Sequence, residues 1–402
     1  MVLFQALKQR AFVLLWSGQT ISRLGDSLYQ IALAWFVVEQ TGSASTMGRV
    51  LIFALTPKVL FLLIGGITVD RFSRVKVMLL SDLLRGLLTI LITLLAFIHL
   101  LEIWHIYVAS LLFGLVAAFF EPAGAALIPQ ITPQEELTSA NSLGSLSVDI
   151  IGVVGPALGA VIIALGGTSI AFGLDALSFF ISALFLWQLL PLAKPKPPSQ
   201  PKTKLLVDLR EGFAFVGASS WLWVSLLIFT LLNFTGRSPM QVTLPFLVRT
   251  KLHADVGTLG LLYATFSAGS VVGAVATGRL PQQRRGLLMY SGLGVTGLMT
   301  VALGLPIALP WLFCAIFVMG TALAVSNLVW NLVIQEQVPA LVLGRVSSIT
   351  LFGSNGLLPL GFALAGWGSD HWGPAQVFVI GGVLTTGLAL VGFSQSSIRT
   401  LA

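Results

Sequence analysis

The sequence predicts an all-α membrane protein with twelve transmembrane helices in two six-helix bundles. Hydrophobic residues make up 56% of the 402 residues and charged residues only 9%, whereas about 25% are charged in an ordinary soluble domain. The apolar residues form long continuous runs, while the strands of a transmembrane barrel alternate with a period of about two. Because polar side chains could not cover so much apolar surface in water, the chain is predicted to work within a bilayer.

The apolar runs have the length that a bilayer requires. A helix needs about 20 apolar residues to cross a hydrocarbon core about 30 Å thick. Dividing the chain at its polar breaks gives twelve spans, with approximate limits 12–38, 47–69, 77–100, 103–128, 140–166, 169–193, 220–247, 256–279, 286–309, 311–335, 346–368 and 374–394. The weakest break is Pro306–Pro310, between the ninth and tenth spans. The first run is too long, and carries charges at its middle, for a cleavable signal peptide.

The distribution of basic residues predicts the topology. Loops on the cytoplasmic side of a membrane carry an excess of Lys and Arg. If the amino terminus is cytoplasmic, that side receives Lys8, Arg10, Arg71, Arg74, Lys76, Lys194, Lys196, Lys202, Lys204, Arg210, Arg279, Arg284, Arg285, Arg345 and Arg399. The opposite face receives only Arg249 and Lys251. Both termini are therefore expected to be cytoplasmic, and the basic excess reflects topology rather than nucleic-acid binding.

The twelve spans divide into two related halves. Residues 193–204 are rich in Pro and Lys, which is typical of a linker, so we predict an N-terminal six-helix bundle over 1–193, a cytoplasmic linker over 194–219 and a C-terminal six-helix bundle over 220–402. The halves also align at an offset of 206 residues, at which Ile128, Pro133, Leu137, Ser142, Gly155, Ala157 and Leu158 match Ile334, Pro339, Leu343, Ser348, Gly361, Ala363 and Leu364. Internal repeats around a midplane site are a recurring transporter design.

Two motifs lie at fixed places in this pattern. The loop after the second span is Gly66-Ile-Thr-Val-Asp70-Arg71-Phe-Ser73-Arg74-Val-Lys76. Its glycine would permit close helix approach and its aspartate could pair with a cation or cap a helix. The fifth span contains Gly152-Val-Val-Gly155-Pro156-Ala-Leu-Gly159, in which small residues form a face for tight packing and the proline bends the helix.

On these motifs the chain resembles the major facilitator superfamily, and within it the twelve-span drug:proton antiporter-like exporters. The first motif is similar to the superfamily's Gly-x-x-x-Asp-Arg-x-Gly-Arg-Lys loop, with Ser73 in place of the second glycine and Val75 between the basic residues. That resemblance implies a conformational latch formed by Gly66, Asp70, Arg71, Arg74 and Lys76. The second is similar to the antiporter motif Gly-x-x-x-Gly-Pro-x-x-Gly, here Gly152, Gly155, Pro156 and Gly159. Simple positive-inside loops and ordinary glycine packing are the respective alternatives.

One feature of the superfamily is missing, and another narrows the resemblance. The arginine expected near the start of the fourth span does not occur between His105 and Phe113; Arg85 in the third span is a conjectural substitute. The segments beginning at Phe120 and Gly344 are similar to the branch that includes macrolide and siderophore exporters.

Ionisable residues inside the spans are costly and therefore candidates for function. Asp26 lies about halfway along the first span, three residues after Arg23, and so shares a helix face with it. We predict that Asp26, with Asp149 within reach, couples transport to protons, because desolvation and nearby cations act in opposite directions on such a carboxylate. The alternative is a static pair of Asp26 with Arg23 or Lys58 that only fixes helix packing.

The same charges predict the substrate cavity. Arg23, Lys58 and Arg237 all fall near the middle of spans, which gives an excess of cations and favours an anionic or acceptor-rich substrate. The alternative is a neutral cavity in which Arg23 pairs elsewhere. Amide side chains in lipid need partners, so the polar lining is predicted to include Asn233, Asn327, Asn331 and Asn355.

These observations give one leading functional hypothesis. The chain is predicted to be a monomeric exporter of amphiphilic small molecules in the bacterial cytoplasmic (inner) membrane, driven by the proton gradient and without a cofactor. A specific exporter or flippase of an anionic metabolite, such as a siderophore or lysophospholipid, is the alternative. Enzyme chemistry finds no support, because Cys314 is the single cysteine and there are only four His with no metal-ligand cluster among the motifs.

Overall fold

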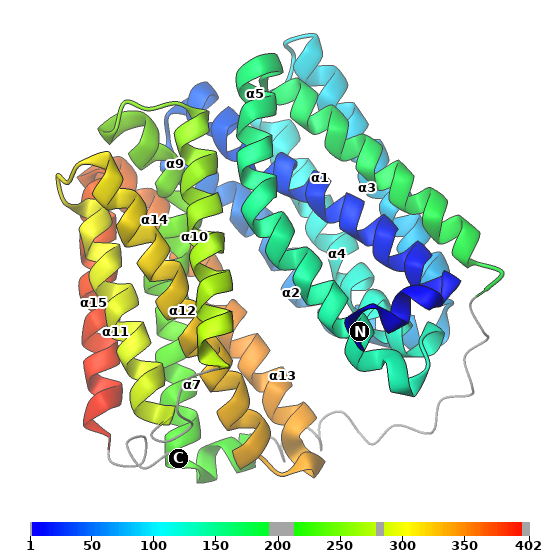
Figure 1. Ribbon diagram of the computed structural model, residues 1–402. Helices are drawn as coiled ribbons and strands as arrows, with labels where there is room; N and C mark the ends of the chain where they lie inside the picture. Colours follow the sequence, from blue (N-terminus) through cyan, green and yellow to red (C-terminus); the bar gives the residue numbers. More distant parts are fainter. Residues whose placement is uncertain (1, 193–212, 279–284, 396–402) are drawn as a thin grey trace. The chain divides into compact units, whose positions relative to one another are not determined.

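The computed structural model describes residues 2–192, 213–278 and 285–395, and within these ranges the chain forms helices and no strand (Figure 1). Eight of the helices in this part of the chain are long and apolar enough to cross a membrane. The predicted linker lies outside the described residues over 193–212, while 213–218 are helical.

The first half of the chain forms five long helices, one of which contains two of the predicted spans. The elements are η1 (Val2–Lys8), α1 (Arg10–Thr41), α2 (Ala44–Arg71), α3 (Arg74–Phe97), α4 (Ile103–Ile131), η2 (Gln134–Glu136) and α5 (Leu137–Leu189). The fifth and sixth predicted spans are the two arms of α5, which meet at Gly167 with φ 76° and ψ 174°. Glycine reaches this conformation without the steric cost that a side chain would impose.

The second half contains the other six predicted spans, and its helices are interrupted more often. Its elements are α7 (Ser220–Leu232), η3 (Asn233–Arg237), α8 (Ser238–Val242), α9 (Leu244–Phe246), η4 (Leu247–Lys251), α10 (Val256–Thr277), α11 (Arg285–Gly304), α12 (Leu309–Gln337), α13 (Ala340–Gly356), α14 (Leu358–Trp372) and α15 (Pro374–Ser394). The seventh predicted span runs from α7 to η4 through two π-helical turns. Pro239, Pro245 and Pro359 each lie at the start of a new helical segment, because proline cannot donate the hydrogen bond of a helix interior.

By their contacts the residues form two compact units. The first comprises Met1–Thr41, Arg49–Gln200 and Asp255–Ala264, and the second comprises Gly42–Gly48, Pro201–Ala254 and Thr265–Ala402. In the first unit α5 packs along α1 and α3, and in the second α11 packs along α12 and α15.

The internal repeat appears in the helix limits and in the packing. Both ends of α12 lie 206 residues after the corresponding ends of α4. A Cβ on Gly86 of α3 would lie 3.0 Å from the ring of Phe180 in α5. A Cβ on Gly297 of α11 would lie 2.6 Å from the amide nitrogen of Thr386 in α15, which is 206 residues after Phe180. Each unit therefore packs its third helix on its sixth through a glycine.

Candidate functional site

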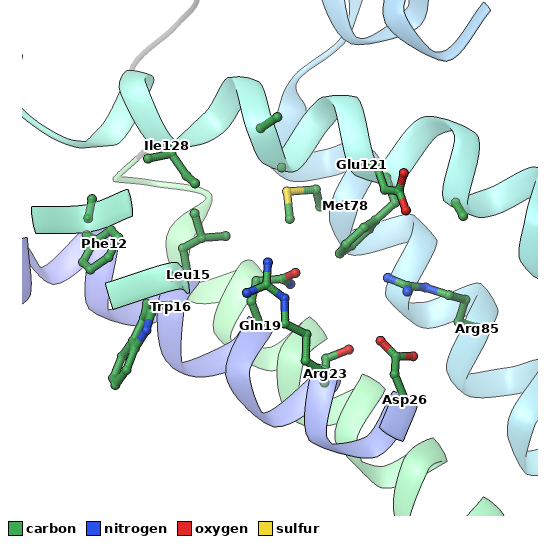
Figure 2. A pocket seen from close by; sticks show the side chains of 17 residues that line it. Phe12, Leu15, Trp16, Gln19, Arg23, Asp26, Met78, Arg85, Glu121 and Ile128 are labelled. Carbon is green, nitrogen blue, oxygen red and sulfur yellow. The ribbon is translucent and has the colours of Figure 1, made fainter. Parts of the chain in front are cut away.

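The first unit encloses a cavity of about 470 Å³ between α1, α3, α4 and α5 (Figure 2). Much of its wall is apolar, with Phe12, Leu15 and Met78 among the residues that line it. The polar side chains of the wall are Gln19, Ser22, Arg23, Asp26, Arg85 and Glu121. A mostly apolar cavity with a few polar groups is the usual form of a small-molecule site.

Asp26 and Arg85 face each other across this cavity. Figure 2 shows the carboxylate of Asp26 and the guanidinium of Arg85 pointing toward one another. Arg23 precedes Asp26 by almost one turn of α1 and also lines the cavity. Arg23 is exposed and Asp26 is half-buried. The cavity therefore presents the carboxylate of Asp26 together with two cations, Arg23 and Arg85.

A buried ion pair fixes Arg85. Its guanidinium donates to Oδ1 of Asp82 at 2.5 Å, and Oδ2 of Asp82 accepts from Ser182 Oγ at 2.7 Å. The guanidinium also lies over the rings of Phe120 at 4.0 Å and Phe179 at 4.7 Å. Charges removed from water need a partner and further hydrogen bonds, and stacking on aromatic faces adds to this stabilisation.

A second buried acid lies behind Asp26. Asp175 of α5 has 0% of its surface exposed and packs on Gly25 of α1, where an added Cβ would lie 2.6 Å from its Oδ1. Tyr29, one turn further along α1, lies with its ring centroid 5.5 Å from that of Phe113 and 5.3 Å from that of Phe172. The hydroxyl of Tyr29 and Oδ2 of Asp175 are buried without a hydrogen-bond partner among the described residues.

The structure brings together only part of the predicted site. Arg23 and Asp26 both line the cavity. Lys58 is not among the lining residues, although its Nζ donates at 2.7 Å to Glu121, which does line the cavity. Asp149 is exposed on α5 and is not among the residues that line the cavity. The proton-coupling role of Asp149 therefore gains no support from this cavity.

The remaining predicted cavity residues belong to the second unit. Asn233 donates through Nδ2 to the carbonyl oxygen of Phe229 at 3.0 Å, and Arg237 is exposed in the π-helical turn η3. Asn327 and Asn331 are exposed on α12, and Asn355 is half-buried on α13. None of these five residues lines the cavity of the first unit.

The predicted excess of cations is not found in this cavity. Its wall carries Arg23 and Arg85 against Asp26 and Glu121, so formal charges balance. Arg85 is moreover paired with Asp82. Of the three cations predicted to share a cavity, Arg23 lines this one and Lys58 and Arg237 do not, because each side chain points where its own helix face is turned. The cation-rich substrate site stays a prediction.

The latch motif is partly corrected. A Cβ on Gly66 would have no neighbour within 4 Å, so Gly66 does not mediate close helix approach. Gly65 does, because its Cβ would collide with the carbonyl oxygen of Ala118 in α4. Arg74 donates to the carbonyl oxygen of Ala126 at 2.6 Å and to Oε1 of Gln130 at 3.0 Å, and thus joins the start of α3 to the end of α4.

The remaining charged residues of this motif are Asp70, Arg71 and Lys76. Arg71 and Lys76 are exposed, and the side chain of Asp70 lies outside the described residues. The latch function of the motif stays a prediction.

The predicted small-residue face of the fifth span packs against α1. A Cβ on Gly155 would lie 2.7 Å from Cβ of Ser27, and one on Gly159 would lie 3.4 Å from Cα of Leu28. Pro156 is buried within α5, and the non-helical residue of α5 is Gly167 rather than the proline. Gly155 and Gly159 therefore pack tightly against α1. Gly152 lies on the same helix, α5. The antiporter role of the motif stays a prediction.

Sequence reasoning missed the partners that organise the site. Arg85 appeared only as a conjectural substitute, and Asp82, Tyr29 and Ser182 were not among the predicted site residues. The spacing of Asp82 and Arg85 by three within an apolar run was a usable signal, because residues three apart share a helix face. No sequence signal connected either residue to Ser182 of α5.

The long apolar helices and the charged cavity define a multi-pass membrane protein, and the known proteins similar to it are transporters of the major facilitator fold rather than enzymes. Solved structures support that fold. A point mutant of the nucleoside transporter NupG superimposes with a TM-score of 0.77 at 13% identity, covering 96% of this chain and 99% of its own. A bacterial homologue of the iron transporter ferroportin gives 0.75 at 15% identity, again covering 96% and 99%.

The chain belongs to the transmembrane secretion effector family, whose model matches residues 2–398. It is 25% identical over 398 residues to macrolide efflux protein A of Streptococcus pyogenes, covering 97% of each chain. It is 30% identical over 338 residues to the enterobactin exporter EntS of Citrobacter koseri, covering 82% of this chain and 74% of that protein. The protein is thus an efflux transporter of the major facilitator type, and the resemblance drawn from the motifs is confirmed.

Proposed function

We propose that this protein exports amphiphilic small molecules by proton-driven alternating access, and that Asp26 carries the coupling proton. The observation that carries the proposal is the place of Asp26, midway along α1 and in the wall of the cavity. A carboxylate in this setting can bind a proton in one state of the cycle and release it in another, because access to water changes the free energy of its charged form.

Asp26 is favoured over the neighbouring acids because it remains available. Asp82 has both carboxylate oxygens engaged, by Arg85 and by Ser182. Glu121 is paired with Lys58, and Asp175 is closed off from the cavity. Within the part of the chain that the structure describes, the carboxylate of Asp26 forms no hydrogen bond and no ion pair shorter than 4 Å, so proton exchange there breaks no existing side-chain bond.

The amphiphile preference follows from the mixed cavity wall and from the relative that exports macrolides. Apolar residues from α1 and α3 line one part of the cavity, while Gln19 and Arg23 offer hydrogen-bond donors. Such a wall suits a molecule with both apolar and acceptor groups.

A specific anionic substrate is the second candidate. The guanidinium of Arg23 is exposed at the cavity, and Arg groups bind carboxylates and phosphates in bidentate fashion. The similarity to an enterobactin exporter favours this candidate as well. We further propose a monomer in the bacterial inner membrane with both termini cytoplasmic, powered by the proton gradient without a cofactor.

Transport in proteoliposomes tests the proposal. Purified protein would be assayed with a labelled macrolide, with enterobactin and with a lipophilic cation, each with and without an imposed pH gradient. We expect gradient-dependent movement of the macrolide, which Asp26→Asn abolishes. Transport of enterobactin alone, lost on Arg23→Gln, would favour the second candidate. Macrolide movement that does not depend on the gradient would refute proton coupling.

A further inference from the structure

Asp175 is the acid in the first unit that the function proposed above leaves unused. It lies on the second arm of α5, is 0% exposed and packs against the backbone of Gly25, the residue before Asp26. An aspartate that is fully removed from solvent at the centre of a helical bundle is costly unless it is paired or neutral.

The hydrogen bonds of Asp175 stabilise a negative charge only weakly. The hydroxyl of Ser178 donates to the main-chain oxygen of Asp175 at 2.7 Å, and its 3.5 Å separation from Oδ1 is at the limit of a hydrogen bond. Oδ2 has no partner in the described part of the chain. An ionised carboxylate in an apolar interior normally accepts several hydrogen bonds, and Asp175 accepts at most one weak one.

The one cation recorded as acting on Asp175 is Arg85, and it is shared with another acid. Arg85 is bound to Asp82, and Arg23 is exposed at the cavity. The titratable or charged groups that act on Asp175 and its neighbour Asp26 are Asp26, Arg23 and Tyr29 of α1, Asp82 and Arg85 of α3, and Glu121 of α4. Asp26 is close enough for the two negative charges to repel, so the pair cannot easily be ionised together.

We propose that Asp175 is a second proton-binding site: it holds a proton as a neutral carboxylic acid and exchanges that proton with Asp26, which opens to the cavity. The O–H bond of Asp175 breaks as an O–H bond forms on Asp26, so one acid is neutral while the other is charged. This inference rests on the proposed function for its role in transport. Its chemical core, a protonated Asp175, does not depend on any substrate.

Tyr29 follows Asp26 by three residues on α1, and we assign its hydroxyl as the link between the two acids. Its hydroxyl is buried and has no partner in the described residues, and it lies within electrostatic reach of both Asp26 and Asp175. A phenolic hydroxyl can donate one hydrogen bond and accept another, so it can hand a proton from one carboxyl group to the other without becoming charged.

Infrared spectroscopy of the purified full-length protein tests the protonation of Asp175 directly. Carboxylic acids and carboxylates absorb at separate frequencies, and the acid band would be compared at neutral pH in the wild type and in Asp175→Asn. The matched control is Asp370→Asn. Oδ1 of Asp370 accepts from the amide of Ala44 at 2.7 Å, and its Oδ2 accepts from Ser43 Oγ at 2.7 Å and from the amide of Ser45 at 3.1 Å, which favours the ionised form.

We expect Asp175→Asn to remove one acid band that Asp370→Asn leaves in place. An unchanged acid band in Asp175→Asn would overturn the inference. If that variant does not fold, Asp175→Glu replaces it: the band should then move to a new frequency, and an unmoved band would overturn the inference equally. Loss of the band together with gradient-independent transport would uphold the proton site while refuting the proposed function.

Exchange between the two acids has its own readout. In Tyr29→Phe the ring packing remains and the hydroxyl is lost, so the acid band of Asp175 should persist while its hydrogen–deuterium exchange slows at least several-fold. Exchange as fast as in the wild type would exclude Tyr29 from the path. Exchange that stays fast in Asp26→Asn would show that Asp175 reaches water by another route and would overturn the link to Asp26.

Discussion

The third helix of each unit packs in the same way but carries different chemistry. Arg74, Met78 and Gly86 of α3 correspond to Arg285, Met289 and Gly297 of α11 at an offset of 211 residues. At the same offset Asp82 corresponds to Leu293 and Arg85 to Thr296, and all four of these residues are buried. The same helix position therefore holds an ion pair in one unit and no charge in the other.

The sixth helices differ in the same sense. Asp175 corresponds at an offset of 206 to Gly381, and a Cβ on Gly381 would collide with the carbonyl oxygen of Thr235. Between its helices the second unit has neutral hydroxyl pairs, Thr235 with Thr385 at 2.8 Å and Tyr290 with Ser225 at 3.1 Å. The second unit therefore forms the corresponding helices without buried acids at these two positions, which is the difference that the variants below test.

The largest expected effect is on coupling. Asp26→Asn should lower gradient-driven transport by about 100-fold or more, the scale on which proteins lose function when a proton-transfer group is removed. Thr385→Val, which breaks a neutral pair of the second unit, is the control and should leave gradient dependence intact. Transport would be measured in proteoliposomes, and equal losses in both variants would contradict the assignment of coupling to the first unit.

The ion pair of α3 can be replaced by the uncharged residues found at the same positions of α11. Arg85→Thr alone leaves Asp82 buried without its cation, so we expect the free energy of unfolding to fall by about 3–5 kcal/mol. The double variant Asp82→Leu with Arg85→Thr installs the residues of α11 and should cost much less than the single change.

Unfolding of the detergent-solubilised protein, followed by circular dichroism, measures the stability of the single and the double variant. A double variant that is less stable than Arg85→Thr would show that the charged pair is itself a requirement of the first unit's fold, against the comparison drawn above.

The adjacent glycines of α2 give a smaller and sharper contrast. Gly65→Ala places a methyl group against the carbonyl oxygen of Ala118, and such overpacking costs about 1–3 kcal/mol. Gly66→Ala meets open space and should be neutral or slightly stabilising, since alanine favours the helix by roughly 1 kcal/mol. The melting temperatures of the two variants measure the difference in stability. A larger fall in melting temperature for Gly66→Ala than for Gly65→Ala would contradict the packing described for α2 and α4.

The last comparison concerns the arginine that begins each third helix, and its ion pair in the second unit has the smallest expected effect. Arg74 binds Gln130 and a main-chain oxygen of α4, whereas Arg285 forms an ion pair with Glu336 of α12, and Glu336 is the counterpart of Gln130. Hydrogen bonds that involve a charged group contribute about 1.5–3 kcal/mol, while a partly exposed pair contributes about 0.2–1 kcal/mol.

Arg74→Ala should therefore destabilise the protein more than Glu336→Gln does, and only the second effect should shrink at high salt. Thermal unfolding at low and high ionic strength measures both. The interpretation fails if Glu336→Gln is the more damaging change.

The order of residues along the chain was enough to predict the helical class, the approximate span limits and the repeat. The thickness of the bilayer sets the length of each hydrophobic run, so the spans can be located from the sequence without knowing how the helices pack. The break at Pro306–Pro310 appears between α11 and α12, and the 206-residue register is visible in α4 and α12. Asp26 was also predictable, because an acid in the middle of an apolar span is unusual wherever its helix packs.

Which charges meet depended instead on how the helices pack. Gly167 turns α5 back on itself and brings Ser182 to Asp82, and the rotation of α2 directs Lys58 to Glu121 and Gly65 rather than Gly66 to α4. Consecutive side chains point about 100° apart around a helix axis. The hydropathy of a continuous apolar run does not reveal which of these directions faces a neighbouring helix. The neighbours of Asp175 lie on α1, α3 and α5, so its burial with one oxygen unpartnered among the described residues became visible only in the folded chain.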